Sequence, residues 1–202
     1  MPADYKNQLK NRLVRMKRIF IAVKVEVGET LLKMISSFKS GLGSESIKWT
    51  NPDNIHITLA FLGDTEEEKI KIISAMLKAK CEGFGTFELI LRGSGVFKNM
   101  SDPRVIWTGI EPSEKLMQLN DYIKNGLEDA GTKIEDRPFK PHLTLGRIKF
   151  LKTGNALKEL IEKYRDTEIQ KVPVNEVILY ESILLQSGPV YKPLSKFKLY
   201  QS

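Results

Sequence analysis

Apolar and polar positions along the chain switch repeatedly between strand-like and helix-like spacing. Runs with a period of two or with many β-branched residues predict strands at 18–25, 55–62, 84–91, 104–110, 142–148, 174–185 and 190–199. Apolar residues at helical spacing predict helices at 29–39, at 64–80 with Asp64 or Thr65 as N-cap, at 113–130 with Ser113 as N-cap, and at 155–164. Consecutive strand pairs interrupt the helix–strand alternation, which favours an α+β fold over a doubly wound sheet.

Size and composition limit the classes of protein to which this chain can belong. With 202 residues and 23.0 kDa, 41% hydrophobic and 28% charged, the chain can form one domain with two lobes and a sizeable core. Its longest uninterrupted apolar stretch, Ile19 to Val23, is far shorter than the about 18 residues of a membrane span. The single cysteine, Cys81, excludes an internal disulfide and a thiolate zinc cluster, and favours a reducing, cytoplasmic location.

The net charge of +7 is concentrated near the N-terminus. Residues 1–18 contain six Lys and Arg against one Asp, so the body is close to neutral and its ligand must be recognised at a local site. We interpret residues 1–15 as a basic N-terminal extension, either dispensable or placed before the domain by a misassigned start, and residues 16–202 as a single domain. A partner- or RNA-binding arm and an ordinary packed helix, with Leu9, Leu13 and Met16 on one face, are the alternatives.

One four-residue pattern occurs twice and contains every histidine of the chain: His56-Ile-Thr-Leu and His142-Leu-Thr-Leu. Both copies lie in predicted strands, where residues i and i+2 share a face, so each copy presents an imidazole beside the hydroxyl of Thr58 or Thr144. With an ordinary pKa of about 6.5, one imidazole can be neutral while the other is protonated near pH 7. Such a pair can act as base and acid while the hydroxyls bind phosphate oxygens, which suits phosphodiester cleavage without a metal.

Two other interpretations of the pair are a structural role and a zinc site. A histidine on a strand is often only structural, but a repeat that holds both histidines is an unusual coincidence. A zinc site usually needs three or more protein ligands, and threonine hydroxyls are poor ones. Neither an HExxH motif nor a cysteine cluster is present in the sequence. The repeat therefore favours acid–base chemistry.

The sequence around these residues resembles the 2H phosphoesterase superfamily, and within it the RNA 2′,3′-cyclic phosphodiesterase branch, also called the LigT-like or 2′-5′ RNA ligase family. The resemblance extends from Arg18 to about Leu199, and the 15 residues before Met16 are its main departure. It rests on five segments: 18–22, 48–63, 103–109, 139–147 and 177–191.

The resemblance implies a bilobal LigT-like fold, with two pseudo-repeated lobes of antiparallel sheet and helices around a central cleft. It implies hydrolysis of RNA 2′,3′-cyclic phosphate ends to 2′-phosphomonoesters without a cofactor, and in some relatives joining of RNA ends through a 2′-5′ linkage. By analogy His56 is the proton donor and His142 the proton acceptor, although the symmetry of the sequence does not fix which is which. Thr58 and Thr144 would bind the phosphate oxygens.

Five further residues are candidates for substrate binding. Arg147 would face away from Thr144 in an ideal strand unless a bulge turns it inward, so a phosphate contact and a surface role both stay open. Lys48 and Lys140 flank the motifs and could contact RNA, or could simply be solvated. Phe139 and Tyr191 could stack on a terminal base. Trp49 and Trp107 could do the same, but core packing is favoured for both.

The expected partner is RNA with a 2′,3′-cyclic phosphate end, such as one half of a cleaved tRNA; we expect no membrane partner and a monomer. Cleavage of 2′,5′-linked oligoadenylate or opening of ADP-ribose cyclic phosphate would use the same fold. A third alternative is an RNA- or nucleotide-binding module of the same fold with little or no catalysis. Because binding alone does not require two imidazoles, the intact repeat favours an enzyme.

Overall fold

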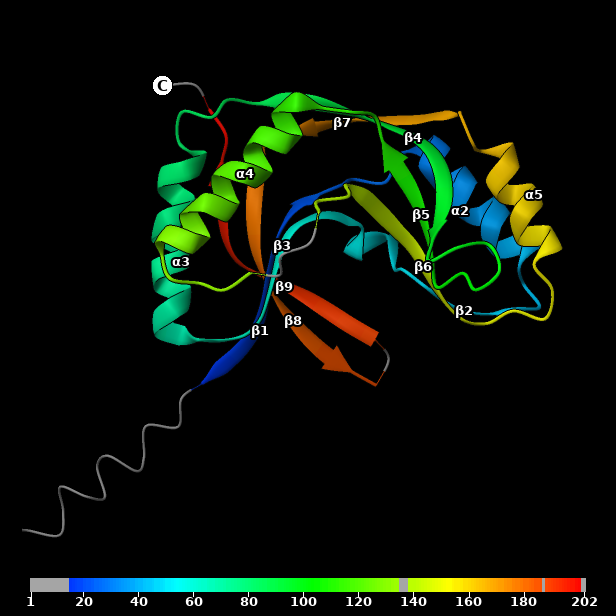
Figure 1. Cartoon of the computed structure of the whole chain (residues 1–202), viewed down its shortest axis with the longest axis horizontal. Coiled ribbons are helices and arrows are strands. Elements are labelled where there is room, and N and C mark those ends of the chain that lie inside the picture. The colour runs from blue at the N-terminus through cyan, green and yellow to red at the C-terminus, as the bar shows by residue number, and fades with distance from the viewer. Residues whose placement is uncertain (1–14, 135–137, 187, 201–202) are drawn as a thin grey trace, which may run out of the picture.

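Nine strands within the described residues form one curled antiparallel sheet (Figure 1). A computed structural model describes residues 15–134, 138–186 and 188–200. The strand order is β7-β4-β5-β6-β3-β1-β8-β9, with β2 paired to β6. The strands are β1 (Met16–Lys24), β2 (Ser46–Trp49), β3 (His56–Glu66), β4 (Phe87–Phe97), β5 (Val105–Ile110), β6 (His142–Phe150), β7 (Glu168–Val174), β8 (Glu176–Leu185) and β9 (Gly188–Lys198). The helices are α2 (Glu29–Gly41), α3 (Glu67–Cys81), α4 (Glu114–Asp129) and α5 (Asn155–Lys163).

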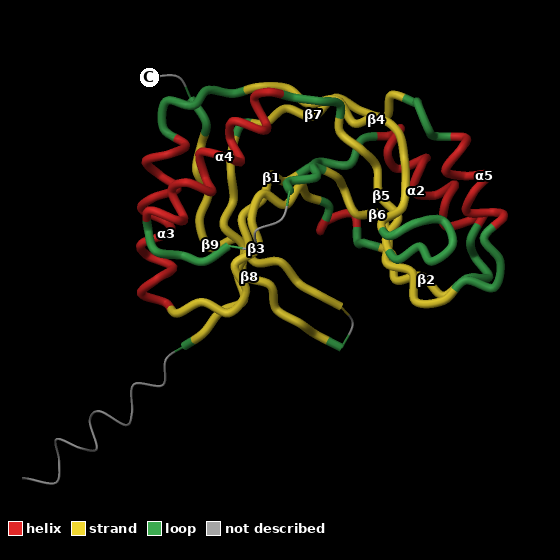
Figure 2. Tube along the Cα trace, in the orientation of Figure 1, coloured by secondary structure: helices red, strands yellow, loops and turns green. Residues whose placement is uncertain are grey.

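The sheet divides into two lobes that meet between β3 and β6. In one lobe α3 and α4 pack against β3, β8 and β9, and in the other α2 and α5 pack against β4 and β7. Figure 2 shows the two helix pairs at opposite ends of the molecule, with the strands between them. Apolar residues of both helix pairs and of the sheet face that they cover make up the large core. The predicted bilobal α+β fold is confirmed.

The helix starts show where local signals were sufficient and where they were not. Ser113 caps α4 as predicted, because its Oγ accepts a hydrogen bond from the Leu116 amide at 3.2 Å. The predicted caps Asp64 and Thr65 are wrong: β3 continues through both residues in register with β1, and α3 begins only at Glu67. Two strands, β2 and β7, were not predicted, and β4 extends six residues beyond the predicted end at Leu91.

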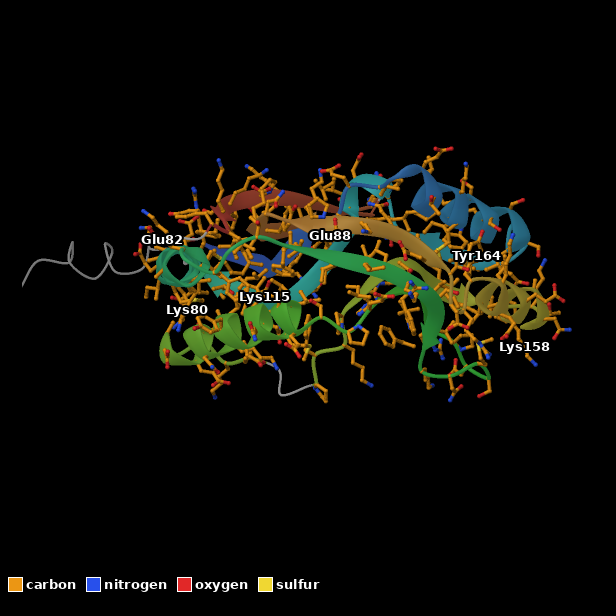
Figure 3. The ribbon with its side chains drawn as sticks, turned by 90° about the horizontal axis from the view of Figure 1, so that it is seen from above. Lys80, Glu82, Glu88, Lys115, Lys158 and Tyr164 are labelled. Carbon is orange, nitrogen blue, oxygen red and sulfur yellow. The ribbon has the colours of Figure 1, made fainter. Side chains whose placement is uncertain are left out.

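Charged side chains cover the outer surface of the lobes (Figure 3). Lys80 of α3 and Lys115 of α4 lie over aromatic rings, 5.6 Å and 5.3 Å from the centroids of Tyr122 and Phe84. No helix of the described residues is long and apolar enough to cross a membrane. The predicted N-terminal extension lies outside the described residues except for residue 15.

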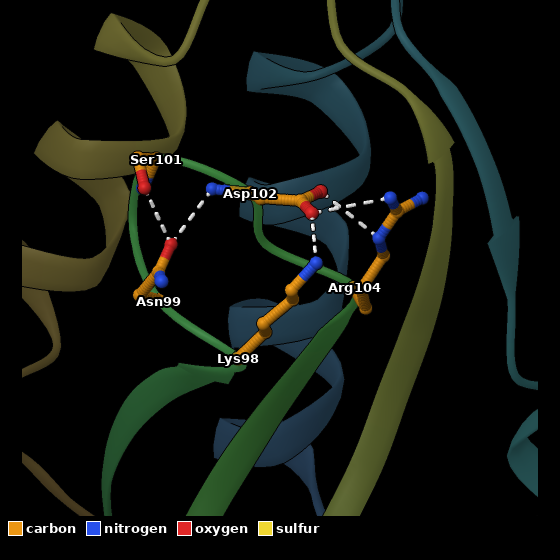
Figure 4. A network of polar contacts seen from close by, with 5 residues as sticks. All are labelled: Lys98, Asn99, Ser101, Asp102 and Arg104. Carbon is orange, nitrogen blue, oxygen red and sulfur yellow. Dashed lines mark hydrogen bonds and ion pairs between the residues drawn. The ribbon is translucent and has the colours of Figure 1, made fainter.

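The loop between β4 and β5 is held by a compact polar network (Figure 4). Asn99 Oδ1 accepts hydrogen bonds from the backbone amides of Ser101 and Asp102 at 3.1 and 2.9 Å. The Asp102 carboxylate pairs with Lys98 and, at 2.9 Å, with Arg104 Nε, and the hydrogen bond from Lys98 is the main reason that its pKa lies below the ordinary value. The network fixes the loop directly after Phe97, the last residue of β4, which faces the candidate site.

Candidate active site

The two H-x-T-L copies meet at the junction between the lobes. The strands that carry them, β3 and β6, pair only at Ile57 and Leu143 within the described residues, and both of these side chains are fully buried. An antiparallel register through this pair sets each histidine across from the threonine of the other copy. The two imidazoles and the two half-buried threonine side chains therefore share one face of the sheet.

Each copy contains a β-bulge at its last residue. In β3 the register with β1 skips Leu59, and in β6 the register with β5 skips Leu145, so the leucine of each motif is the extra residue of a β-bulge. A bulge reverses the side on which the following residues lie. Phe61 and Arg147, each five residues after a histidine, are thereby turned to the histidine face.

The carbonyl groups exposed by the bulges both have hydrogen-bond donors. The Leu59 carbonyl accepts from Nδ2 of Asn120, a fully buried residue of α4, at 2.8 Å. The Leu145 carbonyl accepts from the backbone amide of Thr50 at 2.9 Å. Because an unpaired buried carbonyl is costly, these bonds stabilise the bulges and hence the direction of the residues that follow them.

The histidines have matching hydrogen bonds. Nδ1 of His56 lies 2.7 Å from the carbonyl oxygen of Asn54, and Nδ1 of His142 lies 2.7 Å from that of Lys140. Since a carbonyl can only accept, Nδ1 carries the proton in both rings and donates it. Nε2 of each ring is left for chemistry, as base when neutral and as acid when protonated.

The surroundings lower the pKa of both imidazoles. Burial lowers the pKa of His56 most; the hydrogen bond to Asn54 opposes it, and the positive charges of His142 and Arg147 lower it further. Burial is also the main cause for His142, opposed by the bond to Lys140 and reinforced by Arg147.

Aromatic rings border each imidazole. The Tyr191 ring stands edge-on to His56, with centroids 5.2 Å apart and an interplanar angle of 89°, and Phe20 lies 4.9 Å away on another side. On the other lobe Phe97 is edge-on to His142 at 4.6 Å and 88°. Together with the Nδ1 hydrogen bonds, these contacts restrict the rotation of the rings and so hold Nε2 in one direction.

The structure brings most of the predicted substrate-binding residues to this region. Arg147 lies close enough to lower the pKa of both histidines. It also acts on Tyr191, whose pKa is raised by burial while the positive charge of Arg147 opposes that rise. Lys48 is exposed on β2 directly across from Arg147. Lys140 contributes its carbonyl to His142, while its exposed side chain and half-buried Phe139 lie in the segment before β6 that borders a cavity.

Four other residues near the site were not predicted from the sequence. Phe61 is 42% exposed, and the guanidinium of Arg18 lies 4.9 Å from its ring centroid. Asn54 holds His56 through its carbonyl, and its side-chain amide donates to a carbonyl of the β8–β9 hairpin at 2.9 Å. Phe97 contacts His142 from β4. The equal spacing of Phe61 and Arg147 from the two histidines is the one signal that could have identified a site residue.

The cavities beside the two histidines differ in volume. A cavity of about 880 Å³ borders His142, and a much smaller one of about 160 Å³ borders His56. The small cavity includes Tyr180 and Tyr191 in its wall. Within the described residues no three His, Cys, Asp or Glu side chains gather as a metal site would require. The residues present can transfer protons on two sides of a phosphate and bind its oxygens.

Comparison with known proteins places the chain in a family. A family model described as "LigT like Phosphoesterase" matches residues 21–107 and 110–191. An RNA 2′,3′-cyclic phosphodiesterase of Thermotoga maritima is 36% identical over 182 residues, 88% of this chain and 92% of the relative. One of Methanothermobacter thermautotrophicus is 34% identical over 184 residues, 90% and 98% of the two chains.

Solved structures give the same result. The structure of E. coli LigT complexed with 3′-AMP superposes with a TM-score of 0.74 at 26% identity, and covers 93% of this chain and 100% of that one. A Thermus thermophilus protein superposes with a TM-score of 0.73 at 29% identity, over 91% and 98% of the two chains. The chain therefore belongs to the LigT-like family of 2H phosphoesterases.

Proposed function

We propose that this protein hydrolyses 2′,3′-cyclic phosphate ends of RNA to 2′-phosphomonoesters without a metal ion. The observation that carries the proposal is the matched pair of imidazoles, each with Nδ1 tied to the carbonyl two residues before it and each beside a threonine hydroxyl. The names of the relatives support the substrate class, since several at 32–36% identity are RNA 2′,3′-cyclic phosphodiesterases.

The proposed reaction is an in-line displacement at phosphorus. Nε2 of His142 accepts a proton from water while the water oxygen forms a bond to phosphorus. The bond from phosphorus to O3′ breaks, and Nε2 of His56 donates its proton to O3′. Thr58 and Thr144 donate hydrogen bonds to the non-bridging oxygens, where negative charge grows in the transition state.

This direction of attack determines where the RNA lies. Both O2′ and O3′ belong to the terminal ribose, so the ribose lies on the His56 side. Tyr191 and the exposed ring of Phe61 provide stacking surfaces there for the terminal base. Arg147 and Lys48, neighbours across β6 and β2, would bind the phosphate and the RNA backbone. We propose cytoplasmic RNA ends, including tRNA halves, as the substrates of a monomer.

The experiment that tests this function uses a short RNA ending in 2′,3′-cyclic phosphate, incubated with the protein in excess EDTA. We expect complete conversion to a product with a 2′-phosphate, identified by phosphorus NMR and by its resistance to a 3′-specific phosphatase. A 3′-phosphate product would contradict the proposed leaving group. Absence of turnover together with tight binding of 2′-nucleotides would favour the binding-module alternative.

A second reaction of the same site is joining of RNA ends. If a 5′-hydroxyl replaces water as nucleophile, the same proton transfers give a 2′-5′ phosphodiester, and the cavity beside His142 leaves room for that larger nucleophile. Hydrolysis stays our principal proposal, because water needs no binding surface of its own.

A further inference from the structure

The cavity beside His142 is built differently from the phosphate-binding region. Its volume of about 880 Å³ lies within the about 300–1,000 Å³ of ligand pockets, and most of its wall is apolar. The wall is formed by Phe97, Trp107, Ile110, Met117 and Phe139. Water as nucleophile would leave this space without a ligand.

The aromatic wall is closely packed. A Cβ atom at Gly95 would clash with the indole ring of Trp107, so this glycine allows the indole to lie close against β4. The Phe97 ring lies 5.6 Å from the Trp107 ring centroid and contacts His142 edge-on. Fixed aromatic rings of this kind are suited to hold a flat heterocycle such as a nucleobase.

The polar residues that α4 contributes to the cavity disfavour a phosphate. Glu114, Gln118 and Asp121 come from the first two turns of α4, and Lys140 comes from the segment before β6. Two carboxylates repel a phosphate group but accept hydrogen bonds from exocyclic amino groups. Adenine, cytosine and guanine carry such a group and uracil does not, so the occupant suited to this cavity is an amino-bearing base.

Because His142 itself forms part of the wall, a base in this cavity holds its sugar next to the proposed proton acceptor. We propose that the cavity is an acceptor subsite, which binds the terminal nucleoside of an RNA with a free 5′-hydroxyl. This inference rests on the proposed function. The 5′-oxygen forms a bond to phosphorus and gives its proton to His142; the bond to O3′ breaks and O3′ takes the proton of His56. The product is a 2′-5′ phosphodiester with a free 3′-hydroxyl.

The test compares hydrolysis with joining in one reaction mixture. The substrates are an RNA with a 2′,3′-cyclic phosphate end and the dinucleotide ApA as 5′-hydroxyl acceptor. Met117→Trp fills the cavity from an exposed position of α4, and Met100→Trp is the matched control, because both methionines are 40% exposed and only Met117 borders the cavity. Asp121→Asn probes base preference against Asp129→Asn on the same helix, with UpU as second acceptor.

We expect Met117→Trp to lower joining at least tenfold while hydrolysis changes less than twofold, and Met100→Trp to change neither. Asp121→Asn should reduce the preference for ApA over UpU, and Asp129→Asn should not. Equal losses of hydrolysis and joining in Met117→Trp would place the cyclic phosphate nucleoside in the cavity and overturn the proposal. Unchanged joining in both cavity variants would also overturn it.

Binding is measured separately from catalysis. Titration of the wild-type protein with ApA should shift the imidazole NMR signals of His142, and Met117→Trp should weaken that binding at least tenfold. A wild-type protein that binds ApA in this way but hydrolyses no cyclic phosphate would leave the subsite supported and the proposed function refuted. Hydrolysis without any ApA binding would refute the subsite alone.

Discussion

Substitution of Asn120 tests whether a bulge positions the site. Asn120 is fully buried in α4, and its amide is the donor to the Leu59 carbonyl at 2.8 Å. Asn120→Leu keeps the branching and the number of heavy atoms of the side chain but leaves that carbonyl unpaired, which costs about 1–3 kcal/mol. At about 2–4 °C per kcal/mol for a protein of this size, we expect Tm to fall by about 2–12 °C.

The assay is thermal unfolding followed by circular dichroism, with turnover of cyclic phosphate RNA measured well below Tm. Asn125→Leu, an exposed position on the same helix, is the control and should change stability by less than about 0.5 kcal/mol. Turnover should fall in Asn120→Leu alone, because the bulge directs Phe61 to the histidine face. A wild-type Tm in Asn120→Leu would refute the claim that the Leu59 carbonyl needs this donor.

Three further predictions follow from the site. Asn54→Ala removes the bond to the β8–β9 hairpin; we expect about 1 kcal/mol of lost stability and, through a weaker Nδ1 bond, a lower pKa of the adjacent imidazole, seen by NMR titration. Arg147→Met removes a positive charge that lowers the pKa of both imidazoles, so both pKa values should rise and the pH profile of kcat/KM should move to higher pH; an unmoved profile would contradict this. Gly95→Ala should cost about 1–3 kcal/mol because its Cβ would clash with Trp107, whereas Gly154→Ala, which meets nothing within 4 Å, should unfold like the wild type.

The sequence was sufficient to predict the fold class and the two strands that carry the histidines, but not the pairing of these strands at Ile57 and Leu143. The repeat of His, Thr and Leu combines a period of two with apolar residues on the other face, and both properties are local. Ser113 was predicted correctly as a cap because it needs only the first turn of its own helix. Thr65 was predicted wrongly because the pairing of its strand with β1, a contact between distant segments, outweighs the local capping preference.

Other parts of the site depend on contacts that no local pattern encodes. The bulge at Leu145 turns Arg147 toward the histidines, and its extra residue is visible only in the register with β5. The Asn54 carbonyl that orients His56 belongs to the backbone, so the residue type at that position carries little signal. The large cavity combines segments around residues 97, 107–121 and 139–142, which meet only in the folded chain.

The proton-donor role of His56 and the proton-acceptor role of His142 are tested most directly with a leaving group that needs no proton. His56→Ala and His142→Ala are assayed in EDTA on the cyclic phosphate and on an analogue with sulfur in place of O3′. On the oxygen substrate each variant should lose a factor of about 10²–10⁴, or about 2.7–5.5 kcal/mol of transition-state stabilisation. On the sulfur analogue His56→Ala should recover most of its loss and His142→Ala should not. Wild-type turnover of the oxygen substrate by either variant would contradict the paired-imidazole mechanism, and recovery by His142→Ala alone would reverse the two roles.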